Sequence, residues 1–78
     1  METVADRMYS ARGEQLRALS VESDRTYDEI RRRYLLMPVN RKNAEFRRVD
    51  RIRRKAFERT QRRHEAYRRF LYAEESQQ

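Results

Sequence analysis

The residues that could support acid–base or metal chemistry are few and poorly placed for it. His64 is the only histidine and the chain has no cysteine, so the sequence offers no multi-histidine metal site, no thiolate site and no disulfide. The adjacent acid pairs, Asp28–Glu29 and Glu74–Glu75, would point in different directions on a helix. We therefore expect no enzymatic activity, no catalytic residue, no metal and no cofactor, and we interpret His64 as a hydrogen-bonded structural residue.

Arginine is the residue type whose number and spacing indicate binding. The chain has 18 Arg and 2 Lys, and segment 41–70 holds 13 of these cations against 4 acids. A guanidinium binds carboxylates and phosphates through a planar fork of donors. The segment therefore predicts contact with acidic protein surfaces, anionic phospholipid heads or RNA, while a coding bias toward arginine on a solvated surface is the alternative. The residues that we expect to bind a partner are Phe46, Arg47, Arg48, Arg51, Arg54, Arg59, Arg62, Arg63, Tyr67 and Phe70.

Two features of the same segment argue against assigning all of this charge to nucleic acid. Asp50–Arg54, Glu58–Arg62 and Glu65–Arg69 each place an acid four residues before a base, the orientation that supports a helix. The aromatic residues recur at helical spacing, which favours packing over base stacking. No leucine heptad follows the basic stretch, so the pattern does not fit a basic zipper.

Composition limits what the chain can bury by itself. Its 78 residues allow one domain, and 42% are charged against 37% hydrophobic, a balance near the border at which burial no longer offsets ordering entropy. We therefore expect partners to order the chain. The longest apolar run, 34–37, is far shorter than the ~20 residues that span a bilayer, so we expect no transmembrane segment. Two acids precede Arg7, unlike a secretory or transit peptide, so any import signal should be internal or already removed.

The elements that position the arginines are predicted from helix formers and breakers. Segment 41–73 contains neither Gly nor Pro, which predicts one helix of roughly 50 Å. Pro38 predicts a turn at 37–40. After this turn, Asn40 or Asn43 would cap the long helix.

The apolar side of the long helix is interrupted. Its large apolar residues recur at spacings of three and four, stop over 59–65, and resume at Tyr67. We expect the first half of the helix to pack against the preceding helices. The far end, with Tyr67, Phe70 and Tyr72, should reach another subunit.

The first half of the chain predicts two shorter helices. Apolar residues recur at helical spacing over 2–19, where Gly13 marks either a kink or a close approach to a neighbour. Ser and Asp in 20–24 favour a break, with a second helix over 26–36. The expected fold class is all-α, with two short N-terminal helices and one long basic C-terminal helix. These form a single extended unit, 1–78, ordered by partners.

Residues 36–60 carry a resemblance to known families. Met37-Pro38 and the run RVDRIRRKAF at 48–57 resemble the Leu-Pro turn and Arg-rich helix of the subunit 7 family of the mitochondrial cytochrome bc1 complex. Part of this run also looks like the second helix of LYR-motif proteins, which serve as accessory subunits and assembly factors of mitochondrial complexes. The resemblance covers about 25 of the 78 residues. The Leu-Tyr-Arg tripeptide is absent, and Met8-Tyr9-Ser10 is its nearest counterpart.

This resemblance implies a non-catalytic accessory subunit that bridges neighbouring subunits in a mitochondrial respiratory-chain assembly, peripheral to the inner membrane. Its partners would be other protein subunits, with anionic phospholipid heads as an additional candidate. An RNA-contacting ribosomal or mitoribosomal protein is the alternative that the charge supports. An assembly factor or adaptor that folds on binding is a further alternative.

Overall fold

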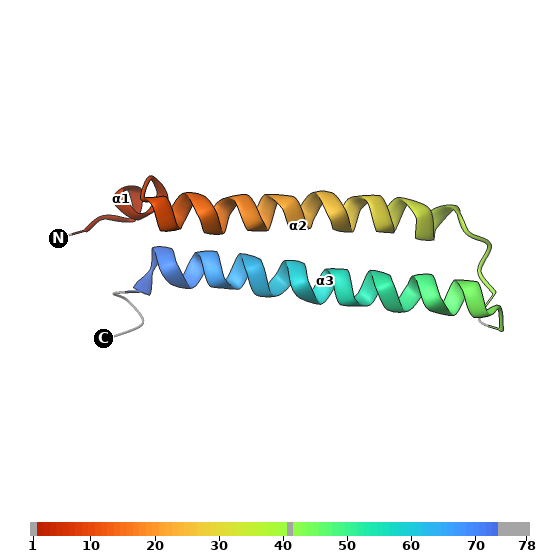
Figure 1. The fold of residues 1–78 in the computed structure, drawn as a ribbon. Coiled ribbons are helices and arrows are strands. Elements are labelled where there is room, and N and C mark those ends of the chain that lie inside the picture. Colours follow the sequence, from red (N-terminus) through yellow and green to blue (C-terminus); the bar gives the residue numbers. More distant parts are fainter. Residues whose placement is uncertain (1, 41, 74–78) are drawn as a thin grey trace.

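The chain folds into a long two-helix hairpin with a short helix at its open end (Figure 1). The computed structural model describes residues 2–40 and 42–73, which contain α1 (Val4–Met8), α2 (Ala11–Leu36) and α3 (Ala44–Leu71) and no strand. α2 and α3 run antiparallel beside each other, and the principal extents are 56 × 23 × 13 Å. The predicted all-α class, the long basic C-terminal helix and the extended shape are confirmed.

The N-terminal half is divided differently from the prediction. The expected helices at 2–19 and 26–36, with a break at 20–24, are wrong, because α2 runs through that segment without interruption. The break lies earlier, at Ser10, whose hydroxyl accepts a hydrogen bond from the Gly13 N–H (3.0 Å) and caps α2. The second helix is therefore not short and has nearly the length of α3.

The serines that favoured a break have another role in α2. Ser20 Oγ donates to the Arg17 carbonyl (2.9 Å), and Ser23 Oγ donates to the Leu19 carbonyl (2.9 Å). Their hydroxyls thus bond to the preceding turn of the helix and do not compete with its backbone bonds. Both serines are buried, so packing against α3 overrides their weak local preference.

α1 lies across the start of α2, where Gly13 leaves room for it. Thr3 Oγ1 accepts from the Asp6 N–H (3.1 Å), and the Asp6 carboxylate accepts from the Thr3 N–H (3.0 Å), which forms a capping box. The bond from the Thr3 N–H, and after it the Thr3 side chain, lower the pKa of the Asp6 carboxyl because they stabilise its charged form. A Cβ on Gly13 would lie 1.9 Å from the Arg7 carbonyl oxygen. Of the two roles expected for Gly13, the close approach is the one observed.

The turn between α2 and α3 lies where Pro38 predicts it. Met37 adopts extended geometry (φ −82°, ψ 139°) and ends α2 immediately before the proline. Of the two expected caps, Asn40 and Asn43, the second caps α3: its side chain accepts from the Glu45 N–H (2.8 Å).

The bounds of α3 are narrower than the predicted 41–73. The helix spans Ala44–Leu71, because the Asn43 cap fixes its start and Tyr72 leaves helical geometry at its end (φ −114°, ψ 26°). Arg41 and the predicted polar tail at 74–78 lie outside the described residues.

A single row of contacts, which we call the seam, joins α2 to α3. Its buried and half-buried positions alternate at spacings of three and four residues on both helices, the pattern of a two-stranded coiled coil. Aromatic pairs lie along it, with ring centres 5.6 Å apart for Tyr27 and Phe57. The seam comprises Gly13, Leu16, Ser20, Ser23, Tyr27, Ile30, Tyr34 and Met37 facing Phe46, Val49, Arg53, Ala56, Thr60, Arg63, Tyr67 and Phe70.

The seam buries little apolar surface. Among the described residues, the buried large apolar side chains are Leu16, Phe46 and Leu71, with exposed fractions of 7–8%, and no side chain is fully buried. Such a core provides little hydrophobic free energy to offset the entropy of ordering two long helices. That partners order the chain remains a prediction, and this thin core is consistent with it.

The far end of α3 is covered by the chain's own first helix. We expected Tyr67, Phe70 and Tyr72 to reach another subunit, but the Arg7 guanidinium donates to the carbonyls of Phe70 (3.3 Å) and Leu71 (3.1 Å). These carbonyls lack partners within the helix, so the cation satisfies them and complements the helix dipole. α1 therefore lies against the last turn of α3. That this end also reaches another subunit stays a prediction, and Tyr72 is 42% exposed.

Replacing Gly13 by alanine should destabilise the hairpin, although the same change stabilises most helix interiors by about 1 kcal/mol. The added Cβ would overlap the Arg7 carbonyl, so α1 must move away from α2 and release the end of α3. We expect the free energy of unfolding to fall by about 1–3 kcal/mol. Urea titration followed by circular dichroism measures it.

Ala18, which is exposed on α2, provides the control for that substitution. Ala18→Gly should cost about 1 kcal/mol, as glycine does in an ordinary helix interior. A Gly13→Ala variant that is more stable than the unmodified chain would contradict the packing of α1 described above.

Candidate cationic interface

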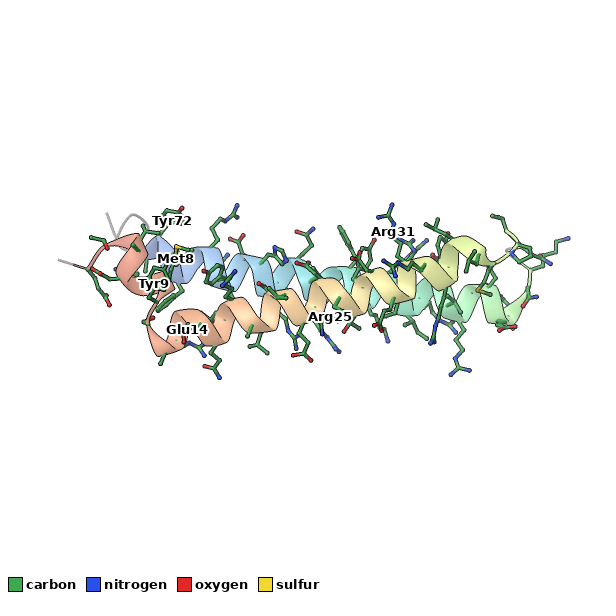
Figure 2. The ribbon with its side chains drawn as sticks, turned by 90° about the horizontal axis from the view of Figure 1, so that it is seen from above. Met8, Tyr9, Glu14, Arg25, Arg31 and Tyr72 are labelled. Carbon is green, nitrogen blue, oxygen red and sulfur yellow. The ribbon has the colours of Figure 1, made fainter. Side chains whose placement is uncertain are left out.

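Among the described residues, the part of α3 that faces away from the seam carries most of the exposed positive charge. α3 contains 11 basic and 4 acidic residues, whereas α2 contains 6 basic and 5 acidic residues. Side chains of both helices extend into solvent along the whole hairpin, among them Arg25 and Arg31 of α2 (Figure 2). We call the exposed cations of α3 the cationic face: Arg47, Arg48, Arg51, Arg54, Lys55, Arg59, Arg62, Arg68 and Arg69.

The heptad pattern decides where these cations lie. Because the seam takes every third and fourth residue, the remaining positions of α3 must point away from α2. Arg48, Lys55, Arg62 and Arg69 recur every seven residues and are all exposed. At 1.5 Å of rise per residue, successive members are about 10 Å apart. The helix therefore presents a straight row of cations to an external partner.

Only some of this charge is neutralised within α3. Arg54 pairs with Asp50 (3.1 Å), and Arg68 and Arg69 both pair with Glu65. Their donors are engaged, whereas the remaining donors face water and can bind an external carboxylate or phosphate. The cations of the face that make no ion pair with another described residue are Arg47, Arg48, Arg51, Lys55, Arg59 and Arg62.

The structure places six of the ten predicted partner-binding residues on the cationic face. These six are Arg47, Arg48, Arg51, Arg54, Arg59 and Arg62. The four that lie in the seam instead, and whose assignment to a partner is corrected, are Phe46, Arg63, Tyr67 and Phe70. Phe46 is 7% exposed and its ring centre lies 5.5 Å from that of Tyr34. The spacing of these four residues matches the seam, so α2 already covers them.

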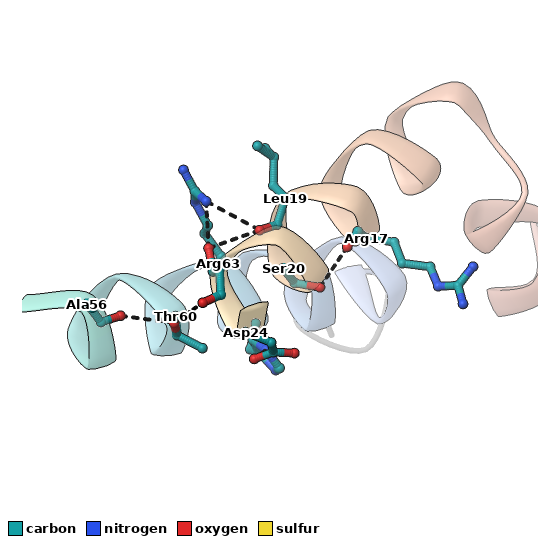
Figure 3. Close-up of polar contacts among 9 residues, drawn as sticks. Arg17, Leu19, Ser20, Asp24, Ala56, Thr60 and Arg63 are labelled. Atoms are coloured by element: carbon teal, nitrogen blue, oxygen red, sulfur yellow. Dashed lines mark hydrogen bonds and ion pairs between the residues drawn. The ribbon is translucent and has the colours of Figure 1, made fainter. Parts of the chain in front are cut away.

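The middle of the seam is held by hydrogen bonds (Figure 3). Arg63 Nη1 donates to the Leu19 carbonyl (3.3 Å) and to Ser23 Oγ (2.5 Å). Thr60 Oγ1 shares its hydrogen between the carbonyls of Ala56 (2.9 Å) and Ser23 (3.3 Å). Such polar contacts fix the register of a coiled coil, because a shifted register would leave them unpaired. We call these residues the polar layer: Ser23, Thr60 and Arg63.

His64 lies beside the polar layer and is hydrogen-bonded, as the sequence indicates. Its Nε2 is 2.9 Å from Asp24 Oδ1, and both side chains are 51% exposed. Within 2–40 and 42–73, no group of three or more histidine, aspartate or glutamate side chains could hold a metal ion. The His64–Asp24 hydrogen bond adds a second polar link between α2 and α3, close to the polar layer along the helix axis.

Arg53 is a seam residue that the sequence pattern alone did not identify. Its guanidinium lies 4.6 Å from the centre of the Tyr34 ring and donates to Asp50 (2.9 Å). The hydrogen bond to Asp50 raises the pKa of Arg53 above its ordinary high value, and the contact with the ring is a cation–π interaction. The signal that could have identified it is its seven-residue spacing from Phe46 and Thr60.

Comparisons of the chain with protein-family models, with curated proteins and with solved structures each found no match. In the described residues of the chain, no helix combines the length and apolar character needed to cross a membrane. The function must therefore be inferred from the surface of the hairpin.

Removing the Arg63 side chain should weaken the hairpin, because Ser23 Oγ would lose its donor in a half-buried position. We expect Arg63→Ala to lower the free energy of unfolding by about 1–2 kcal/mol. Arg51→Ala removes an exposed cation and should change it by less than about 0.5 kcal/mol. Parallel urea titrations followed by circular dichroism measure both, and equal effects would argue against the role of the polar layer.

Proposed function

We propose that this chain is a non-catalytic accessory subunit that bridges neighbouring subunits of a large assembly. The observation that carries the proposal is the cationic face, on which six cations make no ion pair with another described residue. The seam already occupies the other side of α3, so these side chains are left to an external partner. An acidic protein surface suits them, because guanidinium groups bind carboxylates bidentately.

A second contact surface lies at the turn between the helices. Leu35, Leu36 and Val39 are 66%, 85% and 80% exposed, and we call these three residues the apolar tip. Large apolar side chains gathered on a surface typically mark an interaction site. The cationic face and the apolar tip differ in chemistry and in position, so one chain can contact two different neighbours, as a bridging subunit must.

The position of the aromatic residues supports a protein partner over RNA. Proteins that bind single-stranded RNA stack its bases on accessible aromatic rings. Of the four aromatic residues of α3, three are turned into the seam, and the fourth, Phe57, is 44% exposed but packs against Tyr27 of α2. The acids Glu58 and Glu65 also interrupt the positive charge of α3. They would repel a phosphate backbone, whereas a protein surface of mixed charge can accommodate them.

The setting that we propose is a mitochondrial respiratory-chain assembly at the face of the inner membrane. It rests on the resemblance of residues 36–60 to small helical accessory subunits. The cations near the apolar tip, such as Arg33 and Lys42, suit the anionic phospholipid heads found at such a surface. In this arrangement these cations contact the phospholipid heads, while the cationic face and the apolar tip hold protein subunits.

Purification of a tagged copy from its native cells, with and without nuclease, tests the proposal. We expect acidic respiratory-chain subunits to co-purify in both samples. The double substitution Arg47→Glu/Arg51→Glu should reduce their recovery about tenfold or more, because two attractions become repulsions. Quantitative mass spectrometry of the co-purifying proteins measures the loss.

The matched control reverses two exposed arginines of α2, Arg25 and Arg32. Arg25→Glu/Arg32→Glu has the same net charge as the test variant and should recover its partners normally. A loss shared by both variants would show unspecific attraction and contradict the assigned interface. Co-purification of ribosomal particles that nuclease removes would overturn the proposal in favour of an RNA-contacting protein.

A further inference from the structure

The two long helices carry opposite charges on corresponding outward rows. On each helix, residues seven positions apart form a row along the helix axis. The row farthest from the seam has one further row on each side of it, and these two flanking rows are the ones compared. On α2 these rows hold four acids and no cation, and on α3 they hold seven cations and no acid. The α2 rows are Glu14, Val21, Asp28, Leu35 and Gln15, Glu22, Glu29, Leu36, and the α3 rows are Arg47, Arg54, Gln61, Arg68 and Arg48, Lys55, Arg62, Arg69.

Within one hairpin, the attraction between these opposite charges contributes little to stability. Every residue of the four rows is exposed, and the rows point away from the seam on both helices. Packed helix axes are about 8–10 Å apart, so side chains that project outward from both are separated by more than the screening length of about 8 Å in physiological salt. A second molecule can bring such rows into contact.

The register of the seam places opposite charges at the same height. The polar layer fixes how α2 lies against α3, and at this register Glu22 lies level with Arg62 and Glu29 with Lys55. A second hairpin placed alongside, with its turn at the same end, presents the same residues at the same heights. α2 of one copy then meets α3 of the other with both acids opposite cations, and two-fold symmetry repeats the contact.

The row that contains Glu22 and Glu29 is better suited to this contact than its neighbour. Glu22, Glu29, Lys55 and Arg62 make no ion pair with another described residue, whereas two arginines of the other α3 row already pair within the helix. Charges without partners gain most from an opposite charge that arrives from outside. This row therefore marks the side of the hairpin that meets the second copy.

Apolar residues in and beside the contacting rows add to the contact. Ile52 is 43% exposed and Leu36 is 85% exposed. Leu36 lies level with Arg48 of the second copy, whose aliphatic stem can cover it. This cover matters because ion pairs at a protein surface contribute little by themselves.

We propose that two copies of the chain pair side by side, with α2 of each copy against α3 of the other, around a two-fold axis parallel to the helices. Such a contact is isologous and closes at two copies. It adds cover for Ile52 and Leu36 to the small apolar burial of a single hairpin. Arg47, Arg51 and Arg54 remain on the outside, whereas Arg48, Lys55 and Arg62 take part in the pairing. The pairing therefore goes beyond the proposed function and leaves the outer part of the cationic face able to bind other subunits.

Sedimentation analysis of the purified chain tests the pairing directly. We expect a dimer that dissociates on dilution, with a dissociation constant that rises as NaCl is added, because salt screens ion pairs. A monomer at every concentration in low salt would overturn the proposal. This measurement needs no substituted chain, so it decides the matter even where a variant fails to fold.

A charge exchange makes the test specific to the two rows. Glu22→Lys/Glu29→Lys and Lys55→Glu/Arg62→Glu should each raise the dissociation constant about tenfold or more, because like charges then meet in both contacts. An equimolar mixture of the two variants should restore the dimer, because opposite charges meet again. If both variants keep the circular dichroism of the unmodified chain and the mixture fails to associate, the proposal is wrong.

The control Glu14→Lys/Asp28→Lys makes the same change in net charge on the neighbouring row of α2. It should dimerise like the unmodified chain. If it loses the dimer to the same extent as Glu22→Lys/Glu29→Lys, association depends on net charge alone and the assigned contact is overturned. Because these measurements use the purified chain, a negative outcome leaves the co-purification test of bridging unaffected.

Discussion

The three-and-four spacing of the seam determines where the other side chains of the hairpin can lie. On a helix with this repeat, two positions in seven face the partner helix and the others face outward or flank the contact. The abundant arginines of α3 are compatible with a packed helix because nearly all of them fall at the outward positions, where water solvates them. The same constraint gives α3 one face that binds α2 and one that is strongly cationic. α2, nearly neutral overall, supports the helix that carries the charge.

Two arginines of α3 lie in the seam, and each has polar or aromatic partners there. Arg53 lies in the seam, where its guanidinium donates to the Asp50 carboxylate and lies over the Tyr34 ring. Arg63 donates to the backbone and a hydroxyl of α2. Hydrogen bonds offset part of the cost of burying a cation in a contact, and its aliphatic stem can still cover apolar surface. Arg53 meets this condition only in part, because its buried Nε makes no hydrogen bond. These arginines therefore contribute more to the choice of register than to the total free energy of folding.

Sequence reasoning succeeded where a residue has a strong local effect and failed where packing decides. Pro38 fixes the turn through its backbone geometry and Asn43 fixes the start of α3 through its side chain. The turn was predicted, and Asn43 was one of the two predicted caps. Ser20 and Ser23 have only a weak preference against helix, which burial against α3 reversed. The same holds for the candidate site. Its exposed arginines could be predicted from the charge of the segment. Phe46 and Arg63 could be assigned to the seam only once α2 was known to lie beside α3 along its whole length. The position of α1 could not be predicted, because it depends on the contact between Gly13 and the Arg7 carbonyl.

The antiparallel path brings α1 and the last turn of α3 together at the end opposite the turn (Figure 1). The Arg7 guanidinium bonds to the final carbonyls of α3 there. A pulling force applied between the two chain ends would therefore separate α2 from α3 progressively, starting at the open end of the hairpin. The Arg7 bonds would bear the load first, the contacts between the long helices would then break in succession, and the closed end would be the last to feel the tension.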